Sequence, residues 1–536
     1  MKPGRPWYKI PESAPGVSAH MNRHERRAAA EQSSRPEGPA EPTARTTAEL
    51  YERGQGHLAA GRSFEALQCY RQALELTPGV WDLAFRCAVL LCELKQHEEA
   101  LSHLDRCLEI QPQHAMTLYM RARTLRDMKR YSEAILASEL AEALDPTDAD
   151  FFNNAGIILQ HLGRDDEAME KFDRAIWLRP GFVDAVSNKA SSLAQARKFD
   201  EAFAGYALAK SLAPDDATID WNVALLHLLT GNFEAGWAGR ESRWTKRTAP
   251  VPYPVFPSPM WTGQGTVRDK TILIYADEGL GDAIQYARYL PLLAAEGARV
   301  ILVVDDKLRS LLSRLPGVAL CLPKSTGHVP RFDLHCALSS LPLAFGTRID
   351  TIPASRSYLP SVGEAERQVW NGRLGVHDRL RVGLVWSGNQ RHVNDHNRSL
   401  PLKLMTRLVS DKAQFISLQK DLKPADEVAL HGRGDITDLT SHLTDFSTTA
   451  ALIACLDIVV TVDTSVAHLA AASGRPTWIL LPYTPDYRWL LDRNDSPWYP
   501  TVRLFRQDER RDYETVIERI NLALAEQVAA FEARVR

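Results

Sequence analysis

The sequence predicts a multidomain protein whose first half is all-α and whose second half is α/β. Between residues 47 and 246, small, aromatic and proline residues recur every 34 positions. After residue 268, short β-type runs alternate with glycine turns and helical stretches. A chain of 536 residues is too long for one hydrophobic core, so several domains are expected.

The composition excludes several classes of protein. The formal net charge is only -3, so no excess of Lys and Arg indicates a nucleic-acid partner. No run of about 18 apolar residues occurs, so we expect no membrane span. The cysteines are odd in number and mostly lie in apolar stretches, which favours a reducing, cytoplasmic compartment. Neither Cys-x-x-Cys nor His-Glu-x-x-His occurs, so neither a metal nor a cofactor is expected.

The 34-residue period predicts pairs of helices. Two residue series keep this step without a slip: Ala66, Ala100, Ala134, Ala168 and Ala202, and Pro78, Pro112, Pro146, Pro180 and Pro214. Small residues allow two helices to cross closely, and proline ends the second helix. Five clear units start at Thr47, Trp81, Ala115, Ala149 and Val183, and a diverging sixth starts at Ala217 and keeps Gly231 at its turn.

This pattern resembles tetratricopeptide repeats. The resemblance implies a superhelix over residues 47–246 that holds another polypeptide. The preceding residues 1–46 are rich in polar residues and proline and contain hardly any apolar run, so we expect them to be disordered.

An asparagine occupies position six of the last three units, as Asn154, Asn188 and Asn222. An amide donates to and accepts from a peptide backbone at once. In nucleocytoplasmic O-linked sugar transferases, which this arrangement resembles, such a ladder holds an extended acceptor chain. The alternative is that asparagine merely tolerates a solvated helix face.

The second half contains repeated βα units. Candidate strands cover 271–275, 299–304, 381–385, 414–418, 458–462 and 477–481. They predict a first lobe at 268–365 and a second at 376–510, joined to the repeats by a linker at 247–267. A C-terminal helix within 511–536 is expected to pack back across the first lobe.

A glycine turn, Gly279-Leu-Gly281-Asp282, follows the first strand. It has three interpretations. A dinucleotide site would use Asp305 and Asp306 for a ribose, but Ile284 replaces the third glycine of that fingerprint. Asp282 is otherwise a helix cap, or a general base that faces the cleft between the lobes.

The second lobe carries a candidate anion site. Asp463, Thr464 and Ser465 lie in a turn between a strand and a helix, where free amides and hydroxyls bind phosphate. His468, one turn later, either faces the same ligand or is a buried structural histidine. Further donors and cations are expected at the carboxyl edge of the sheet: Ser387, Asn389 and Arg398 for phosphates, and Gln419 and Lys420 for the base and ribose.

Together, Gly281-Asp282, Arg398-Ser-Leu-Pro401, Asp463-Thr-Ser-x-x-His468, Pro485 to Trp489 and Ser496 to Pro500 resemble one family. It comprises bacterial tetratricopeptide proteins with a C-terminal GT-B, heptosyltransferase-like (family 9-like) domain, similar to flagellin-modifying glycosyltransferases. The implied fold is a repeat superhelix followed by two Rossmann-like lobes.

The resemblance also implies residue roles. Asp282 would be the base, Arg398 would bind the donor pyrophosphate, and the segment from Asp463 to His468 would hold the donor. Arg398 stands where the relatives usually carry lysine, and Ser465 replaces their glycine, so the donor's identity stays open.

The expected function is metal-independent transfer of a sugar from a nucleotide-sugar donor to a protein, with flagellin as the first acceptor to test. One rival is a non-catalytic scaffold or chaperone with a degenerate GT-B domain. A second is a transferase that acts on a glycan or lipid-linked acceptor.

Overall fold

The computed structural model describes residues 42–245, 254–390 and 394–535. The chain divides into two compact units, Met1–Ser192 and Leu193–Arg536, and each is considered by itself. This division falls inside the predicted repeat domain rather than after it. Most of the segment 1–46 that we expect to be disordered lies outside the described residues, as does part of the predicted linker.

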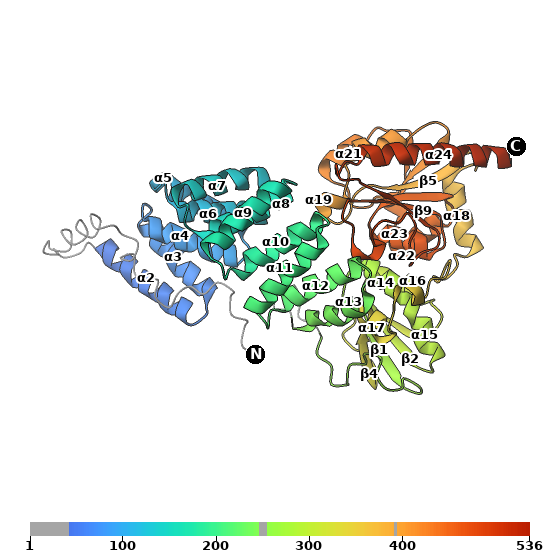
Figure 1. Ribbon diagram of the computed structural model, residues 1–536, viewed down its shortest axis with the longest axis horizontal. Coiled ribbons are helices and arrows are strands. Elements are labelled where there is room, and N and C mark those ends of the chain that lie inside the picture. Colours follow the sequence, from blue (N-terminus) through green and yellow to red (C-terminus); the bar gives the residue numbers. More distant parts are fainter. Residues whose placement is uncertain (1–41, 246–253, 391–393, 536) are drawn as a thin grey trace. The chain divides into compact units, whose positions relative to one another are not determined.

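The first unit consists of paired antiparallel helices (Figure 1). They are α2 (Pro42–Ala59), α3 (Ser63–Leu76), α4 (Trp81–Glu93), α5 (His97–Ile110), α6 (Ala115–Asp127), α7 (Tyr131–Leu144), α8 (Ala149–His161) and α9 (Asp165–Leu178), and α10 (Val183–Gln195) leads into the second unit. The predicted starts at Trp81, Ala115, Ala149 and Val183 are the first helical residues, whereas the first helix begins earlier than predicted, at Pro42.

Every repeat turns on one residue with a left-handed backbone. These residues lie 34 positions apart and have φ between 58° and 88°: Gly61, Lys95, Lys129, Gly163, Arg197 and Gly231. The alanines of the repeat pattern are fully buried where the helices of a pair cross. The period therefore reflects both the turn and the packing of each pair.

The second unit begins with the last repeats and continues into two lobes. Its helical part is α11 (Phe199–Leu212), α12 (Ala217–Leu229), α13 (Phe233–Arg240) and the 3-10 helix η2 (Glu241–Trp244). The first lobe has a parallel sheet of order β3-β2-β1-β4, and the second a parallel sheet of order β10-β9-β8-β5-β6-β7 (Figure 1). Two separate parallel sheets with helical crossovers are the expected α/β lobes.

The strands of the first lobe are β1 (Thr271–Tyr275), β2 (Arg299–Val304), β3 (Val318–Pro323) and β4 (Leu334–Ala337). Those of the second are β5 (Leu380–Val385), β6 (Ala413–Ser417), β7 (Ile436–Asp438), β8 (Ile458–Val462), β9 (Thr477–Leu481) and β10 (Val502–Arg506). The helices that bear on the site are α14 (Leu280–Tyr286), α18 (Glu364–Leu374), α19 (Asp395–Arg398), α23 (Ser465–Ala472) and α24 (Glu514–Val535).

The C-terminal helix corrects one expectation. Helix α24 packs on the second lobe and not on the first, because its apolar face, which includes Val516, Ile520 and Phe531, shares a core with strands β5 and β10. Helix α18, which spans the interval left between the two predicted lobes, is tied to the second lobe by Arg381, whose Nη1 donates to Asn371 Oδ1 at 2.7 Å.

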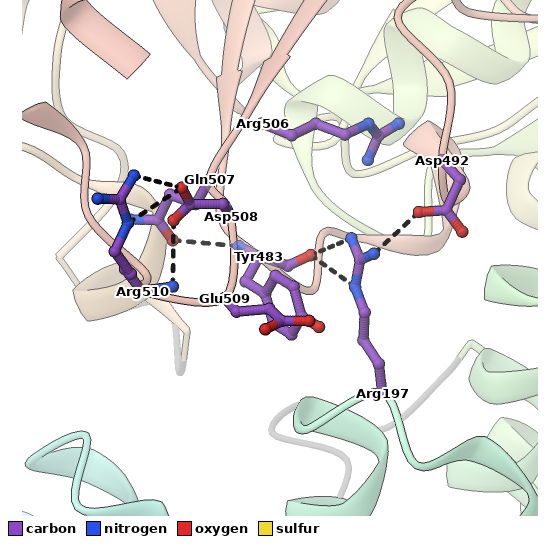
Figure 2. Close-up of a pocket in the computed structure, with 8 residues that line it drawn as sticks. All are labelled: Arg197, Tyr483, Asp492, Arg506, Gln507, Asp508, Glu509 and Arg510. Atoms are coloured by element: carbon purple, nitrogen blue, oxygen red, sulfur yellow. Dashed lines mark hydrogen bonds and ion pairs between the residues drawn. The ribbon is translucent and has the colours of Figure 1, made fainter. Parts of the chain in front are cut away.

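The last repeats share a hydrophobic core with the lobes. Phe233 and Trp237 of α13 are buried in the same cluster as β1 and β9, and Trp237 Nε1 donates to the Thr347 carbonyl at 3.0 Å. On the second lobe, the turn residue Arg197 donates to the Tyr483 carbonyl and to Asp492 Oδ1 at 2.9 Å (Figure 2). The α/β half of the chain thus includes the end of the repeat array.

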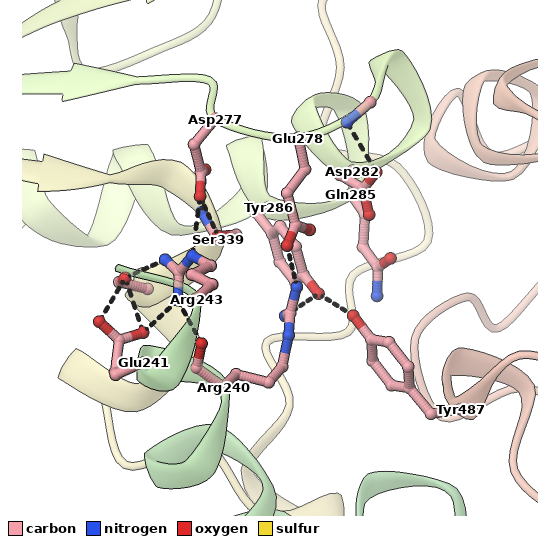
Figure 3. Close-up of polar contacts among 12 residues, drawn as sticks. Arg240, Glu241, Arg243, Asp277, Glu278, Asp282, Gln285, Tyr286, Ser339 and Tyr487 are labelled. Atoms are coloured by element: carbon pink, nitrogen blue, oxygen red, sulfur yellow. Dashed lines mark hydrogen bonds and ion pairs between the residues drawn. The ribbon is translucent and has the colours of Figure 1, made fainter. Parts of the chain in front are cut away.

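A buried ionic network completes this attachment (Figure 3). Arg240 pairs with Glu278 and donates to the Tyr286 hydroxyl at 3.2 Å. Arg243 pairs with Asp277 at 3.1 Å. Both arginines are only 2% exposed, and both carboxylates closely follow β1. Two arginines at the end of the repeat array therefore neutralise the two carboxylates of the loop that leads into Asp282.

Among the described residues, no helix combines the length and apolar character that crossing a bilayer requires.

We predict that a fragment of residues 193–536 folds, whereas one of residues 247–536 does not. The shorter fragment lacks Arg240 and Arg243, whose removal from a buried ion pair costs about 3–5 kcal/mol per pair, and it also lacks Phe233 and Trp237 of the shared core. That loss is comparable to the whole stability of a domain, about 5–15 kcal/mol. Thermal unfolding followed by circular dichroism checks this, and equal midpoints for the two fragments would contradict it.

Candidate active site

Asp282 lies in the first turn of α14, at the boundary between the two lobes. Its Oδ2 accepts the Gly279 N–H at 3.0 Å, and its Oδ1 forms an ion pair with Arg488 of the second lobe. Asp282 therefore caps helix α14, as one interpretation expected. Its second carboxylate oxygen also pairs with an arginine of the other lobe. Burial raises the pKa of Asp282 to about 6, although Arg488 opposes the shift.

Gly281 is a point of close approach between the lobes. A Cβ atom at this position would lie 2.8 Å from His468 Cδ2 and 3.5 Å from Ser465 Cα. Helix α14 thus packs directly against the start of α23. The structure brings together the glycine turn and the anion-site motif, which lie far apart in the sequence.

His468 is held on two sides. Its Nδ1 lies 2.8 Å from the Tyr499 hydroxyl, and its ring stacks on Trp489 with centroids 5.4 Å apart. Burial, with Arg488 adding to it, lowers the pKa of His468 to about 3. The histidine is therefore neutral at physiological pH, and it offers a ligand a ring nitrogen but no positive charge.

Arg398 and Asp463 lie side by side at the carboxyl edge of the sheet. Arg398 Nη1 donates to the Asp463 carbonyl at 3.1 Å, while its Nε lies 3.7 Å from Asp395 Oδ1. Arg398 Nε is buried and has no hydrogen-bond partner within the described parts of the chain. Burial and the nearby Asp486 raise the pKa of Asp463 to about 6. Arg398 therefore places a positive charge beside Asp463 at this edge of the sheet.

Other predicted donor residues have different surroundings. Gln419 Oε1 accepts the Ser387 N–H at 2.9 Å and the Trp386 N–H at 3.1 Å, so this amide fixes the loop after β5. Lys420 Nζ donates to the Leu443 carbonyl. Asn389 is exposed. Thr464 is the N-cap of α23, and its side chain makes no capping hydrogen bond to that helix.

The three asparagines differ in burial: the first is buried, whereas the other two are partly exposed. Asn154 is 2% exposed and accepts from Arg126 Nη1 at 2.7 Å, and its amide nitrogen is without a partner among the described residues. Asn188 is half-buried and donates to Asn153 Oδ1 at 3.0 Å. Asn222 is half-buried and belongs to the second unit.

Arg488 lies in the segment Pro485 to Trp489, for which the sequence indicated no role. It follows β9, and Arg506 holds its far side by donating to the carbonyls of Trp489 at 2.6 Å and Leu490 at 2.9 Å. The pocket beside it, about 470 Å³, is lined by Arg197, Tyr483, Asp492 and Arg506 among others (Figure 2). Because Arg197 and Arg506 already bind carbonyls there, we assign no ligand to this pocket.

The site therefore lies between two α/β lobes that follow the helical repeats, and comparison with known proteins identifies parts of the chain. Residues 57–124 and 119–182 match models of the tetratricopeptide repeat, and residues 415–521 match the model of glycosyltransferase family 9 (heptosyltransferase). The chain therefore combines tetratricopeptide repeats with a C-terminal glycosyltransferase family 9 domain, and it is a glycosyltransferase.

Relatives share different portions of the chain. Protein FlbA of Caulobacter vibrioides is 25% identical over 496 residues, which is 87% of this chain and 82% of that protein. The human protein O-mannosyl-transferase TMTC3 is 31% identical over 153 residues, which is 27% of this chain and only 16% of that protein.

Solved structures resemble part of the chain. TTC0263, a thermophilic TPR protein of Thermus thermophilus, is 22% identical, with 34% of this chain and 100% of that chain covered at a TM-score of 0.30. MamA of Desulfovibrio magneticus RS-1 is 18% identical, with 31% and 94% covered at a TM-score of 0.30.

Replacing Gly281 by alanine should destabilise the contact between the lobes. The new methyl group would overlap the His468 ring, which Tyr499 and Trp489 prevent from moving away. We expect the free energy of unfolding in urea to fall by about 1–3 kcal/mol. Gly327→Ala is the control, because a Cβ there meets nothing within 4 Å. Equal effects of the two substitutions would show that the lobes do not approach at Gly281.

Proposed function

We propose that the protein transfers a sugar from a nucleotide-sugar donor to a protein hydroxyl, with Asp282 as general base. The observation that carries this proposal is the meeting of the Asp282 turn with the turn of the family 9 domain that begins α23. Asp282 itself lies outside the matched residues 415–521, so its role rests on the resemblance and on this geometry.

In the proposed reaction, the acceptor oxygen attacks the anomeric carbon of the donor. Asp282 takes the hydroxyl proton while the bond from that carbon to the phosphate oxygen breaks, and the phosphate leaves with the bonding electrons. The ordinary value for aspartate is near 4, so a pKa of about 6 makes Asp282 a better proton acceptor while it stays ionised at neutral pH.

The negative charge on the leaving phosphate also needs compensation. Arg398 is the favoured partner, because it is a cation beside Asp463 at the carboxyl edge of the sheet. The first amides of α23, to which the N-cap side chain makes no hydrogen bond, are further donors. His468 adds a neutral contact only, given its low pKa. These groups support metal-independent transfer.

The repeat arm supports a polypeptide acceptor. The amide nitrogen of Asn154 is buried without a partner among the described residues, a state that costs about 1–3 kcal/mol unless a ligand group accepts its hydrogen bond. A bound peptide carbonyl would supply that acceptor once the side chain turns outward, because the nitrogen is closed off from solvent in the conformation described. The name of the relative TMTC3 also specifies transfer to protein. Flagellin, indicated by the resemblance, is the first candidate acceptor.

Two rivals make different predictions. A scaffold or chaperone with a degenerate domain would bind no nucleotide sugar, and calorimetric titration tests this directly. A transferase acting on a lipid-linked glycan would bind the donor but would leave the buried amide of Asn154 without a role. The family 9 match favours an enzyme over the scaffold.

Replacing Asp282 by asparagine should slow transfer by about 10²- to 10⁴-fold, the usual contribution of a general base. The amide keeps the shape of the side chain but does not take up a proton. Donor affinity, measured by calorimetry, should stay near that of the unmodified enzyme. Activity close to normal in Asp282→Asn would remove the base assignment.

The pH dependence of kcat/KM should also report the ionisation of Asp282. A base works only when deprotonated, so kcat/KM should fall about tenfold per pH unit below the Asp282 pKa of about 6 and level off above it. Initial rates from about pH 5 to about pH 8 check this, because proteins tend to be most stable in that range. The residual activity of Asp282→Asn should lack the acid limb.

Replacing Asn154, Asn188 and Asn222 together by alanine should weaken acceptor binding by about tenfold or more, since each lost hydrogen bond is worth about 0.5–1.5 kcal/mol. Purified flagellin is the first acceptor to titrate. Donor binding should not change, and Asn521→Ala on α24 is the matched control. Unchanged acceptor affinity in the triple variant would count against the ladder.

A further inference from the structure

We propose that Arg488 is a positioning residue for glycosyl transfer, which holds the Asp282 carboxylate ionised and oriented from across the boundary between the lobes. The inference rests on the proposed function, because it takes Asp282 as the base. It adds a residue to which neither the family match nor the sequence motifs gave a task.

All three nitrogens of the Arg488 guanidinium group make contacts. Arg488 forms an ion pair with Asp282 Oδ1, its Nε donates to Gln285 Oε1 at 2.8 Å, and its Nη1 donates to Asp486 Oδ1 at 2.6 Å. The side chain is 12% exposed. Asp282 and Gln285 belong to one helix of the first lobe, so a single planar group fixes that helix face. The other carboxylate oxygen of Asp282 is held by the Gly279 N–H, so the base has a defined direction.

Arg488 is itself held in place before any substrate arrives. It lies in the 3-10 helix η8 (Tyr487–Trp489), and Leu490, which follows this helix, has a left-handed φ of 51°. Arg506 secures this turn through the carbonyls of Trp489 and Leu490. Such strain persists only where surrounding contacts fix it. The loop therefore presents the guanidinium to Asp282 at little further entropic cost.

The ion pair with Arg488 has a large influence on the pKa of Asp282, because the other nearby charges partly cancel. Burial raises its pKa, as do Glu278 before α14 and Asp486 of the second lobe, whereas Arg488 and Arg240 of the last repeat lower it. The buried His468 of α23 is neutral. Arg240 is already paired with Glu278. Within the described residues, Arg488 is the one cation in ion-pair contact with Asp282, so its loss would leave a buried carboxyl that stays protonated near neutral pH.

The test compares pH–rate profiles of Arg488→Gln and Arg488→Lys. A neighbouring arginine lowers a carboxyl pKa by about 1–3 units, so Arg488→Gln should move the acid limb of kcat/KM upward by at least about one unit. Because the shift starts from a pKa of about 6, activity at pH 7 should fall about 2-fold for a one-unit shift and about 100-fold for a three-unit shift, and it should recover in part at higher pH. Arg488→Lys keeps the positive charge, so the acid limb of its pH–rate profile should stay near that of the unmodified enzyme. Its kcat should fall, because lysine lacks the planar group that orients Asp282.

Arg433→Gln is the control, because Arg433 pairs with Asp435 on the surface and should leave the profile unchanged. A purely structural role for Arg488 would lower the melting temperature and reduce the rate by one factor at every pH. That outcome would overturn the inference.

A second measurement does not need turnover. In protein with ¹³C-labelled aspartate, the Asp282 carboxyl signal, identified by its loss in Asp282→Asn, should titrate at higher pH in Arg488→Gln. An unchanged titration would overturn the inference even if Asp282 is essential. Full activity of Asp282→Asn would instead refute the proposed function, while the titration would still report the pairing of Arg488 with Asp282.

Discussion

The catalytic half of this protein depends on two neighbouring carboxylates that are buried just after the first strand. Asp277 and Glu278 lie at the carboxyl edge of a parallel sheet, where removal from water would be costly without cations. Their paired cations come from Arg243 and Arg240, at the end of the repeat array, and not from the first lobe itself. Burial raises the pKa of Glu278, but the two arginines outweigh it and leave the carboxylate ionised. The last repeats are thus part of the same compact unit as the lobes.

This dependence extends to the candidate base. Tyr286 contacts Arg240 on one side and the Tyr487 hydroxyl, at 2.6 Å, on the other. Tyr487 precedes Arg488, which pairs with Asp282. The last repeat, the glycine turn of the first lobe and the loop after β9 therefore meet in one buried polar cluster. Low dielectric strengthens each interaction in such a cluster and makes the loss of any member expensive.

Much of the architecture could be predicted because it repeats. The 34-residue period located the first helix of five units to the residue, and β1, β2, β8 and β9 were found as uninterrupted apolar runs. Strands β3, β4, β7 and β10 were not predicted. Strand β3 is half-exposed, β4 and β7 have only four and three residues, and arginines interrupt the apolar run of β10. The position of α24 was wrong because an amphipathic helix does not specify which of two sheets it covers.

The sequence predicted the motifs of the site but not the ion pairs between distant residues. The sequence identified Asp282, Arg398 and His468 from local patterns, but an ion pair between residues 206 positions apart leaves no local signal. Arginines at the end of the repeat array, and two acidic residues after a buried strand, were the available indications of the Arg240 and Arg243 pairs. Gln419 shows the opposite difficulty, because an amide that fixes a loop is indistinguishable in sequence from one that binds a base.

The turn of the fifth repeat carries an arginine where other repeats have glycine or lysine, and Arg197 uses this position to bind Tyr483 and Asp492. The residues after this turn belong to the same compact unit as the lobes. The four repeats before it belong to the other unit, and helix α10 continues from one unit into the next. The array therefore divides within helix α10, so a change in the number of upstream repeats would leave the packing of the last repeats on the lobes as it is.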